Sequence, residues 1–393
     1  MNFTITFWTI FGVSIWIDLL TALIFLFIKK KKKSQKNINK PVTVMIPVHR
    51  ESLKDIEKTI ISIYKEDFKL KNCIICGDSD SENIKSLVKK LSQKYKNLVY
   101  IESSEKSKAR KINYIVRSKK EFLCEFLYVR DCNVQSNDNS IKDLLINFND
   151  NKIAAVTSNG YVEPPKNFLG RSYHYGKEWI NKLGWFRKLQ QEKRQAVFVV
   201  CGASTLYRTS VLRKIPIPDT TKTEDTHYTW KLQIEGYKIA IAKETKIFSP
   251  DVEGKYFKGL FKQIRQSYRW SSGTVQCLYI ERKNLSKNKK LLYTTIIPGA
   301  IEALTYSIAL VLLPLIFFIS PTFFWGFIIG DTFFSLLGTI LFTPKRLLHT
   351  IFHYPQIMFY KYINASIFLT ALITVTFQRI FYKNTRWSNE WKS

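Results

Sequence analysis

The segment VTVMIP at residues 42–47 is a short apolar run that ends in a proline. Its length and composition predict a buried strand, and residues 53–64, which follow it, have the apolar spacing of a helix. Short apolar runs and helically spaced segments continue to alternate through residues 73–76, 84–95, 98–101, 108–116 and 126–129. This alternation predicts an α/β domain built on a doubly wound, mostly parallel sheet.

Polar residues directly follow three of the predicted strands. Ligands of doubly wound sheets bind beyond the carboxyl ends of the strands, so these residues mark the expected binding edge. They are Pro47, His49 and Glu51 after the first strand, Asp78 after the second, and Asp131 and Asn133 after the fourth. The sequence therefore predicts a polar site along one edge of the sheet.

The composition limits the possible partners. A chain of 393 residues has room for one globular domain of about 250 residues and a few membrane helices. Its 61 basic and 31 acidic side chains give a net charge of +30, which favours an acidic membrane or a phosphorylated substrate. Because no zinc-finger or RNA-binding signature is visible, nucleic acid is not expected. We interpret Cys73 and Cys76, a C-x-x-C pair, as strand residues in a reducing cytosol rather than a metal or redox site.

Residues 3–28 form an apolar run that is long enough to cross a bilayer core of about 30 Å. The run lacks a small-residue cleavage site, so we expect a retained anchor instead of a signal peptide. Lysines occupy residues 29–33 directly after it, and the positive-inside rule then places the N-terminus outside and the next domain in the cytoplasm. Residues 29–40 are expected to form a basic linker that contacts anionic membrane lipids.

The C-terminal part of the sequence predicts further membrane segments. Residues 294–319 and 323–342 are apolar and should form a helical hairpin. Residues 347–362 mix polar with apolar side chains and predict a separate interfacial helix, while residues 367–380 could form a fourth span. Since an even number of spans would put the basic C-terminus outside, the side of the C-terminus stays open. We expect a multi-pass protein of the cell membrane.

One basic motif and one acidic motif each predict the start of a helix that could take part in binding or catalysis. In SKARKIN, residues 107–113, Lys108 begins a cationic helix, which suits a diphosphate. In Thr223-Glu224-Asp225, Thr223 can cap a helix and the acidic residues can stabilise its first turn. The alternative to this purely structural role is that Asp225 accepts a proton from a bound hydroxyl.

The segment QSYRW at residues 266–270 has helical spacing. Gln266, Arg269 and Trp270 are three and four positions apart, so they share one helix face. Arg269 can bind a phosphate group, and Trp270 can present its ring to a sugar. The alternative is an amphipathic helix on the membrane surface, and both can hold together.

These motifs, in this order, resemble those of the membrane-embedded family 2 glycosyltransferases, which include the synthases of cellulose, chitin, hyaluronan and poly-N-acetylglucosamine. The resemblance covers about residues 41–273 and implies a GT-A-like fold. It divides the chain into an anchor (1–28), the basic linker (29–40), a GT-A domain (41–255), interfacial helices with the QxxRW motif (256–293) and a C-terminal membrane region (294–393).

The resemblance also implies a role for each motif. Asp78 would contact the uracil of a UDP-sugar in a nucleotide-sugar site to which Pro47, His49, Glu51, Lys108, Asp131 and Arg269 also belong. Asp225 would be the general base, with Glu224 beside it in the catalytic pair. The acceptor would lie against Gly202, Gln266 and Trp270.

Two positions depart from the pattern of the family. Asp131 and Asn133 occupy the place of an Asp-x-Asp motif that holds Mg or Mn, and an asparagine brings no charge to such a site, so a weaker metal affinity is expected. Ceramide glucosyltransferases are similar in having a non-acidic residue at this place. Ser107 stands where the family has glycine, which could keep the backbone farther from the phosphates.

Three functions follow from these expectations. The first is an inverting glycosyltransferase that builds a β-linked polysaccharide from a UDP-sugar at the cytoplasmic face of the membrane. The second is the transfer of a single sugar to a lipid acceptor, which Asn133 and the small membrane part favour. The third is an inactive membrane scaffold. The sequence does not name the sugar.

Overall fold

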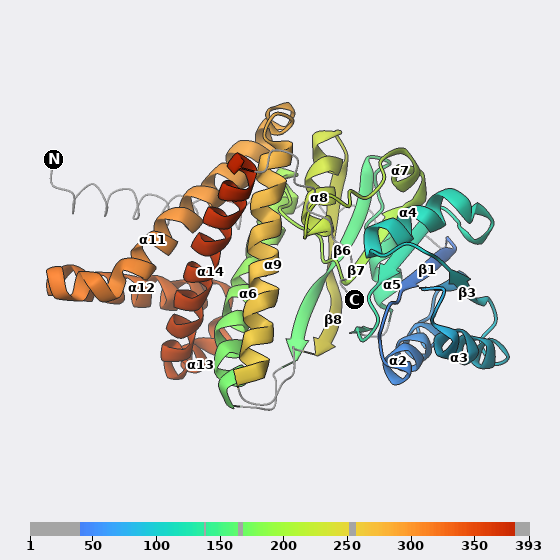
Figure 1. Cartoon of the computed structure of the whole chain (residues 1–393), viewed down its shortest axis with the longest axis horizontal. Helices are drawn as coiled ribbons and strands as arrows, with labels where there is room; N and C mark the ends of the chain where they lie inside the picture. Colours follow the sequence, from blue (N-terminus) through green and yellow to red (C-terminus); the bar gives the residue numbers. More distant parts are fainter. Residues whose placement is uncertain (1–39, 137–138, 164–167, 251–256, 382–393) are drawn as a thin grey trace.

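The structure is a computed structural model that describes residues 40–136, 139–163, 168–250 and 257–381. The predicted anchor at residues 3–28 and its lysine run lie outside the described residues. A sheet with a helix layer on each face occupies one end of the molecule, and long helices occupy the other (Figure 1).

The sheet contains eight strands in the order β3-β2-β1-β4-β7-β6-β8-β5. Their bounds are Val42–Pro47 (β1), Leu70–Gly77 (β2), Leu98–Glu102 (β3), Phe126–Arg130 (β4), Gln135–Ser136 (β5), Ile153–Glu163 (β6), Ser204–Arg208 (β7) and Lys238–Pro250 (β8). Strands β3, β2, β1 and β4 are parallel to one another, as are β6 and β8, while β7 runs antiparallel to both of its neighbours. The predicted α/β fold with a mostly parallel sheet is confirmed, and the antiparallel strand β7 joins its two parallel parts.

Two apolar cores hold helices against the sheet. Alternate residues of β1 point to opposite faces, so Val44 enters one core and Met45 the other. The first core seats α2 (Leu53–Tyr64), α3 (Glu82–Ser92) and α5 (Ser140–Ile146), and the second seats α4 (Lys108–Ser118), α7 (Thr209–Lys214) and α8 (Glu224–Ile234). Since β1 is buried along its whole length, its continuous apolar run is explained by this double cover.

The cysteines confirm the expected strand role of the C-x-x-C pair. Cys73 and Cys76 are fully buried in β2 and belong to opposite cores, because residues three apart on a strand face opposite sides. Burial raises the pKa of both thiols to about 12. All six cysteines of the chain are free.

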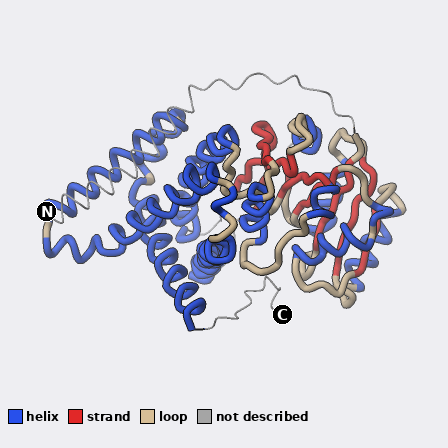
Figure 2. The backbone as a smooth tube through the Cα atoms, turned by 90° about the horizontal axis from the view of Figure 1, so that it is seen from above, coloured by secondary structure: helices blue, strands red, loops and turns tan. Residues whose placement is uncertain are grey.

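Helices form the second part of the molecule: one lies between β6 and β7 in the sequence, and the others follow β8. Their bounds are Phe168–Arg194 (α6), Phe257–Glu281 (α9), Lys289–Leu291 (α10), Ile297–Ile319 (α11), Pro321–Phe342 (α12), Leu347–Phe352 (α13) and Tyr354–Phe381 (α14). Helices α6, α9 and α14 lie side by side between the sheet and the α11–α12 pair (Figures 1 and 2). Three helical stretches are long and apolar enough to cross a membrane: Lys289–Ile319, Pro321–Leu341 and Tyr354–Phe381.

Two local expectations were wrong. Thr223 precedes α8 as predicted, but its side chain makes no capping hydrogen bond; instead its hydroxyl faces the thiol of Cys277 at 3.9 Å. The separate interfacial helix at residues 347–362 is also not formed. The chain turns at His353, so that stretch divides between the short α13 and the first turns of α14.

Candidate active site

Lys108, Asp131 and the backbone of Gly202 meet at the carboxyl ends of β1 and β4. The hydroxyl of Ser107 accepts a hydrogen bond from the N–H of Arg110 and so fixes the start of α4, which carries Lys108. The ammonium group of Lys108 donates to the Asp131 carboxylate and, at 2.6 Å, to the carbonyl oxygen of Gly202. Burial by itself would lower the pKa of Lys108. The nearby carboxylates of Asp131 and Glu224 have the larger effect, and the pKa of Lys108 is raised.

Asp225 approaches the same point from the first turn of α8. A Cβ added to Gly202 would lie 2.7 Å from Oδ2 of Asp225, so the glycine is what lets the carboxylate come this close. The other oxygen, Oδ1, accepts a hydrogen bond of 2.8 Å from the N–H of Thr226. The loop before β7 and the start of α8 therefore hold Asp225 beside Lys108.

Glu224, the neighbour of Asp225, is partly buried among charged groups. Burial and the carboxylate of Asp225 raise the pKa of Glu224, and the positive charges of Lys108 and Arg269 offset this only in part. Asp225, Lys108 and Arg269 therefore all lie within electrostatic reach of Glu224. Glu224 therefore keeps its proton to a higher pH than an exposed glutamate does.

Helix α9 brings Arg269 to the site because it docks against α8. The side chain of Thr223, directly before α8, occupies the space that a Cβ on Gly273 would need, so the backbone of α9 packs closely against Thr223. His227 and Glu281 form a buried pair at 2.9 Å that ties the far end of α9 to α8. The structure brings Lys108, Asp131, Gly202 and Asp225 together from distant parts of the sequence, and Arg269 lies within electrostatic reach of Glu224 beside them.

The QxxRW face is completed by a residue that sequence reasoning missed. The ammonium group of Lys177 on α6 lies 3.4 Å from Oε1 of Gln266 and 5.7 Å from the centre of the Trp270 ring. Trp270 remains 42% exposed, so much of its ring is open to a ligand. No short-range signal marks Lys177, because α6 lies about ninety positions before α9.

Asp78 anchors a second polar cluster, beyond β1 and β2. Its Oδ2 lies 2.5 Å from Nδ1 of His49, and its Oδ1 lies 2.7 Å from the ammonium group of Lys111. Lys111 is fully buried and also donates to the carbonyl oxygen of Val48 at 2.5 Å. A nucleotide base that binds to Asp78 would share the carboxylate oxygens of Asp78 with His49 and Lys111. No role for Lys111 was predicted from the sequence.

A cavity of about 390 Å³ opens between the loops that follow β1 and β2. Glu51, Asp80 and Asn83 are among its lining residues. The carboxylate of Glu51 accepts a hydrogen bond of 2.5 Å from the N–H of His49, which gives the first loop a fixed shape. Pro47 ends β1 at this edge, so the predicted nucleotide-sugar residues from the two loops lie together.

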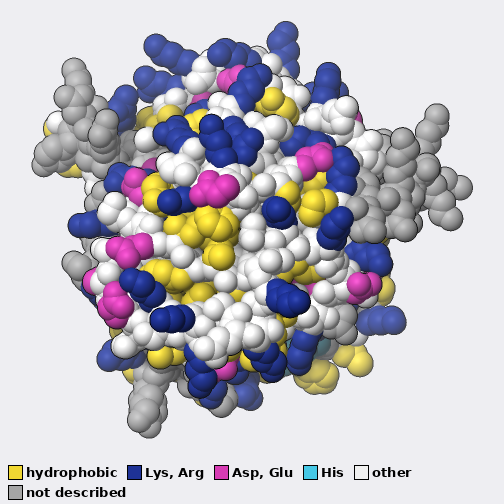
Figure 3. Space-filling view, turned by 90° about the vertical axis from the view of Figure 1, so that its right-hand side faces the viewer, with side chains coloured by type: hydrophobic (Ala, Val, Ile, Leu, Met, Phe, Trp, Pro, Cys, Tyr) yellow, Lys and Arg dark blue, Asp and Glu magenta, His cyan; other side chains and the backbone are white. Residues whose placement is uncertain are grey.

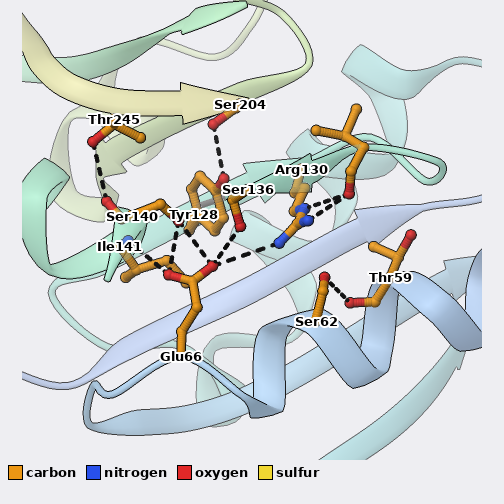
Figure 4. Close-up of polar contacts among 11 residues, drawn as sticks. Thr59, Ser62, Glu66, Tyr128, Arg130, Ser136, Ser140, Ile141, Ser204 and Thr245 are labelled. Atoms are coloured by element: carbon orange, nitrogen blue, oxygen red, sulfur yellow. Dashed lines mark hydrogen bonds and ion pairs between the residues drawn. The ribbon is translucent and has the colours of Figure 1, made fainter. Parts of the chain in front are cut away.

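A buried ion pair shapes the loop that carries Asp131 and Asn133. Arg130 donates through Nε to the carbonyl oxygen of Val134 at 3.1 Å, and its Nη1 lies 3.7 Å from Glu66 (Figure 4). Glu66 in turn accepts hydrogen bonds from Ser136, Ser140 and the N–H of Ile141. The clamp from Arg130 to Val134 closes a tight turn, in which Asn133 has a φ of 69°.

The described residues contain no group of three or more His, Cys, Asp or Glu side chains that could hold a metal ion. Asp131 is 40% exposed at its side chain, and Lys108 donates to its Oδ1. Asn133 is exposed two positions later. Asp131 and Asn133 thus offer two oxygen donors, and a cation held there would need further oxygens from a bound diphosphate.

Lys188 of α6 is a further basic group beside the site. Burial lowers the pKa of Lys188, and the charges of Cys201 and Asp225 only partly offset this. Basic side chains are also spread over the sheet end of the molecule, with fewer acidic groups between them (Figure 3). The site and its surroundings are therefore suited to an anionic ligand.

Comparisons with known proteins agree on one family. A family model described as glycosyl transferase family 2 matches residues 43–216, and one described as glycosyl transferase family group 2 matches residues 136–372. The chain is 25% identical over 266 residues to the poly-beta-1,6-N-acetyl-D-glucosamine synthase of Staphylococcus aureus, and the match covers 66% of this chain and 61% of the synthase. It is 32% identical over 99 residues to the uncharacterized glycosyltransferase YaiP of Escherichia coli, which is 25% of this chain and 24% of that protein.

Among solved structures, a mannosyltransferase from Pyrobaculum calidifontis in complex with GDP-Man and Mn2+ has a similar fold. The TM-score is 0.66 at 15% sequence identity, over 97% of this chain and 99% of that one. The likeness shows a shared GT-A-like fold. Because the longer of the two family matches, residues 136–372, covers more than half of the chain, this protein belongs to glycosyl transferase family 2 and is a glycosyltransferase.

Proposed function

We propose that this enzyme transfers a sugar from a UDP-sugar to a hydroxyl group of a growing β-linked polysaccharide, with inversion at the anomeric carbon. One observation carries the proposal: Lys108, Asp131, Gly202 and Asp225 meet at one point of the sheet edge, with Arg269 within electrostatic reach. The match to a poly-N-acetylglucosamine synthase supports a polymer as the product.

The donor is proposed to lie along the sheet edge, from the cavity beside Glu51 to Lys108. Its base would bind near Asp78, and its diphosphate would lie between Lys108 and Arg269. The carboxylate of Asp131 holds the ammonium group of Lys108 at this edge of the sheet, and Arg269 lies within electrostatic reach of Glu224. A similar fold binds GDP-Man in the archaeal mannosyltransferase, and this supports a nucleotide sugar as the donor here.

A divalent cation, Mg or Mn, is proposed to bind through Asp131 and Asn133. It would neutralise charge on the diphosphate when bound. The fold likeness to a structure that holds Mn2+ supports this proposal, and Asn133 predicts weaker binding than two carboxylates would give. The ammonium group of Lys108, which donates to Asp131, would move toward the phosphates when they arrive.

The reaction is a single displacement. The carboxylate of Asp225 accepts the proton of the acceptor hydroxyl, whose oxygen forms a bond to the anomeric carbon. The bond from that carbon to the diphosphate oxygen breaks, and the electron pair leaves with the diphosphate, whose charge Lys108 and Arg269 stabilise. Gly202 and the exposed face of Trp270 are proposed to hold the acceptor ring.

The place of the reaction is proposed to be the cytoplasmic face of the cell membrane. The helices long and apolar enough to span a membrane join the sheet through α6 and α9, so the site would lie just outside the bilayer. Transfer of one sugar to a lipid acceptor remains the second candidate, because ceramide glucosyltransferases also have a non-acidic residue at the place of Asn133. Since the predicted catalytic groups converge, we do not retain the inactive scaffold.

The test is an activity assay on purified protein in detergent, with a panel of UDP-sugars and GDP-mannose and with magnesium or manganese. We expect one UDP-sugar to support transfer and the product to be a polymer; one added sugar on an extracted lipid would select the second candidate. Asp225→Asn should lower turnover at least about a thousand-fold while UDP binding stays within about three-fold, because a general base and its positioning are lost.

Glu224→Gln is the matched control for Asp225→Asn. The raised pKa of Glu224 favours its protonated form, which a glutamine imitates, so this variant should retain far more turnover than Asp225→Asn. Equal losses in the two variants would contradict the assignment of Asp225 as the base. Turnover of Asp225→Asn at the wild-type rate would contradict the proposed reaction.

A further inference from the structure

A second cavity, of about 480 Å³, is lined by none of the residues that are proposed for the transfer. It is enclosed by one face of α6, the end of β6 and the turn that follows α12. Its polar lining includes Glu178, Lys182, Lys345 and Arg346, and its apolar walls include Trp185 and Pro344. The proposed transfer uses none of these side chains.

The cavity carries more positive than negative charge. Lys182 and Arg346 both donate to one oxygen of Glu178, Oε1, at 2.6 and 2.7 Å. Lys345 stands beside them and is exposed. The three cations around a single carboxylate leave a net charge of +2.

The cavity also lies where the chain leaves an apolar span. The candidate span Pro321–Leu341 ends directly before the turn that lines the cavity. The next helix, α13, exposes Leu348, Ile351 and Phe352. Exposed apolar side chains next to basic ones are typical of the boundary between headgroups and acyl chains.

We propose that this cavity binds the phosphate headgroup of an anionic phospholipid. The cations supply the charge for the phosphate, Trp185 and Pro344 flank the glycerol region, and the exposed side chains of α13 lie along the acyl chains. A neutral glycan would gain nothing from the excess positive charge, and a free phosphate would gain nothing from the apolar neighbours. The inference does not depend on the reaction proposed above.

The test is native mass spectrometry of the full-length chain in detergent, with dioleoyl phosphatidylglycerol or dioleoyl phosphatidylcholine as the probe. We expect phosphatidylglycerol to bind at least about ten-fold more tightly, since each nearby cation contributes several-fold to anionic lipid binding. The double variant Lys345→Gln/Arg346→Gln should lower that affinity roughly twenty-fold. Its matched control is Lys289→Gln/Lys290→Gln, which removes two exposed cations at the start of the span Lys289–Ile319, where neither residue lines this cavity.

For Glu178→Gln we predict a higher, not a lower, affinity for phosphatidylglycerol. Removing the carboxylate frees Lys182 and Arg346 from their shared partner, so phosphatidylglycerol should bind about five-fold more tightly. This variant keeps the test decisive if the double variant fails to fold. Weaker binding in Glu178→Gln, or unchanged binding in a folded double variant, would overturn the proposal.

A competition distinguishes the lipid from a free anion. Inorganic phosphate at the same concentration should not displace phosphatidylglycerol, because it lacks the apolar part of the ligand. Equal competition by phosphate would overturn the lipid assignment. Displacement by an N-acetylglucosamine oligosaccharide would overturn it as well and would assign the cavity to a glycan.

Discussion

Gly202 shows how a single absent side chain can place a catalytic group. The Asp225 carboxylate occupies the space that a Cβ at position 202 would need, at 2.7 Å from Oδ2. The carbonyl oxygen of Gly202 also accepts a hydrogen bond from Lys108, so the backbone there contacts both charges. A side chain at this position would separate a base from the cation that faces it.

We predict that Gly202→Ala lowers turnover about a hundred-fold, because a displacement of the base of about 1 Å is enough for such a loss. The thermal unfolding midpoint should change little, since Asp225 is part-exposed and can move toward solvent. Steady-state kinetics and an unfolding scan measure the two effects.

Gly184→Ala is the control for this prediction. A Cβ at position 184 has no heavy atom within 4 Å, and alanine is a better helix former than glycine by about 1 kcal/mol. This variant should keep wild-type turnover and lose no stability. A Gly202→Ala enzyme as active as Gly184→Ala would show that Asp225 need not lie where the structure places it.

At the scale of elements, α14 lies along α9 over most of its length. Tyr360 packs with Leu260 near the start of both helices, and Thr376 is hydrogen-bonded to Tyr279 at 2.8 Å near the end of α9. Helix α9 exposes several cations, among them Lys262, Arg265 and Arg269, so it cannot lie in the hydrocarbon of a bilayer. Because α14 lies along α9, α14 should lie at the same level relative to the membrane, although it is apolar and long enough to span the bilayer.

We therefore predict that α14 lies at the membrane surface and that the C-terminus is on the same side as the catalytic domain. An epitope tag after residue 393 should be cleaved by protease in everted vesicles and protected in intact cells. The reason is that α14 follows α9 from Leu260 to Tyr279, although α14 also packs on α11.

Two internal tags calibrate this experiment. A tag inserted after Gln93, on the exposed surface of the sheet domain, should behave like the C-terminal tag. A tag at Ser320, between α11 and α12, should show the opposite accessibility. Opposite accessibility of the Gln93 and C-terminal tags would make α14 a membrane span.

At the scale of the whole molecule, one buried polar cluster joins the long helices. Asp331 of α12 binds Lys361 of α14 at 2.8 Å and accepts a hydrogen bond of 2.6 Å from Tyr306 of α11. The ammonium group of Lys361 also lies 4.6 Å from the ring centre of Trp179 on α6. Four helices thus share one ion pair, and α6 carries this connection to the sheet domain.

We predict that Asp331→Asn destabilises the protein by about 3 kcal/mol, because the charge of Lys361 would stay buried without a counter-charge. The double variant Asp331→Asn/Lys361→Met should recover most of the loss. Unfolding of the detergent-purified variants, followed by tryptophan fluorescence, measures the difference.

Glu302→Gln is a suitable comparison for Asp331→Asn. Glu302 pairs with Arg187 at 2.7 Å, but the side chains are 26% and 48% exposed, so its loss should cost less than about 1 kcal/mol. Equal effects of Asp331→Asn and Glu302→Gln would mean that the buried cluster does not hold the helices together.

Local patterns in the sequence determined much of this protein. Alternating apolar runs predicted the sheet and its helices, since periodicity depends only on neighbouring residues. Position after a strand identified Asp78 and Asp131, and helical spacing placed Gln266 and Trp270 on one face. The predicted residues Lys108, Gly202 and Asp225 also lie together in the structure.

Only the tertiary structure decided which distant residues meet. Lys111 under Asp78 and Lys177 between Gln266 and Trp270 carry no pattern of their own, because their partners lie on other elements. The packing of α14 on α9 is likewise invisible in composition, which makes α14 resemble a span. Spacing along the chain constrains the neighbours within one helix or strand, whereas contacts between elements depend on how the whole chain packs.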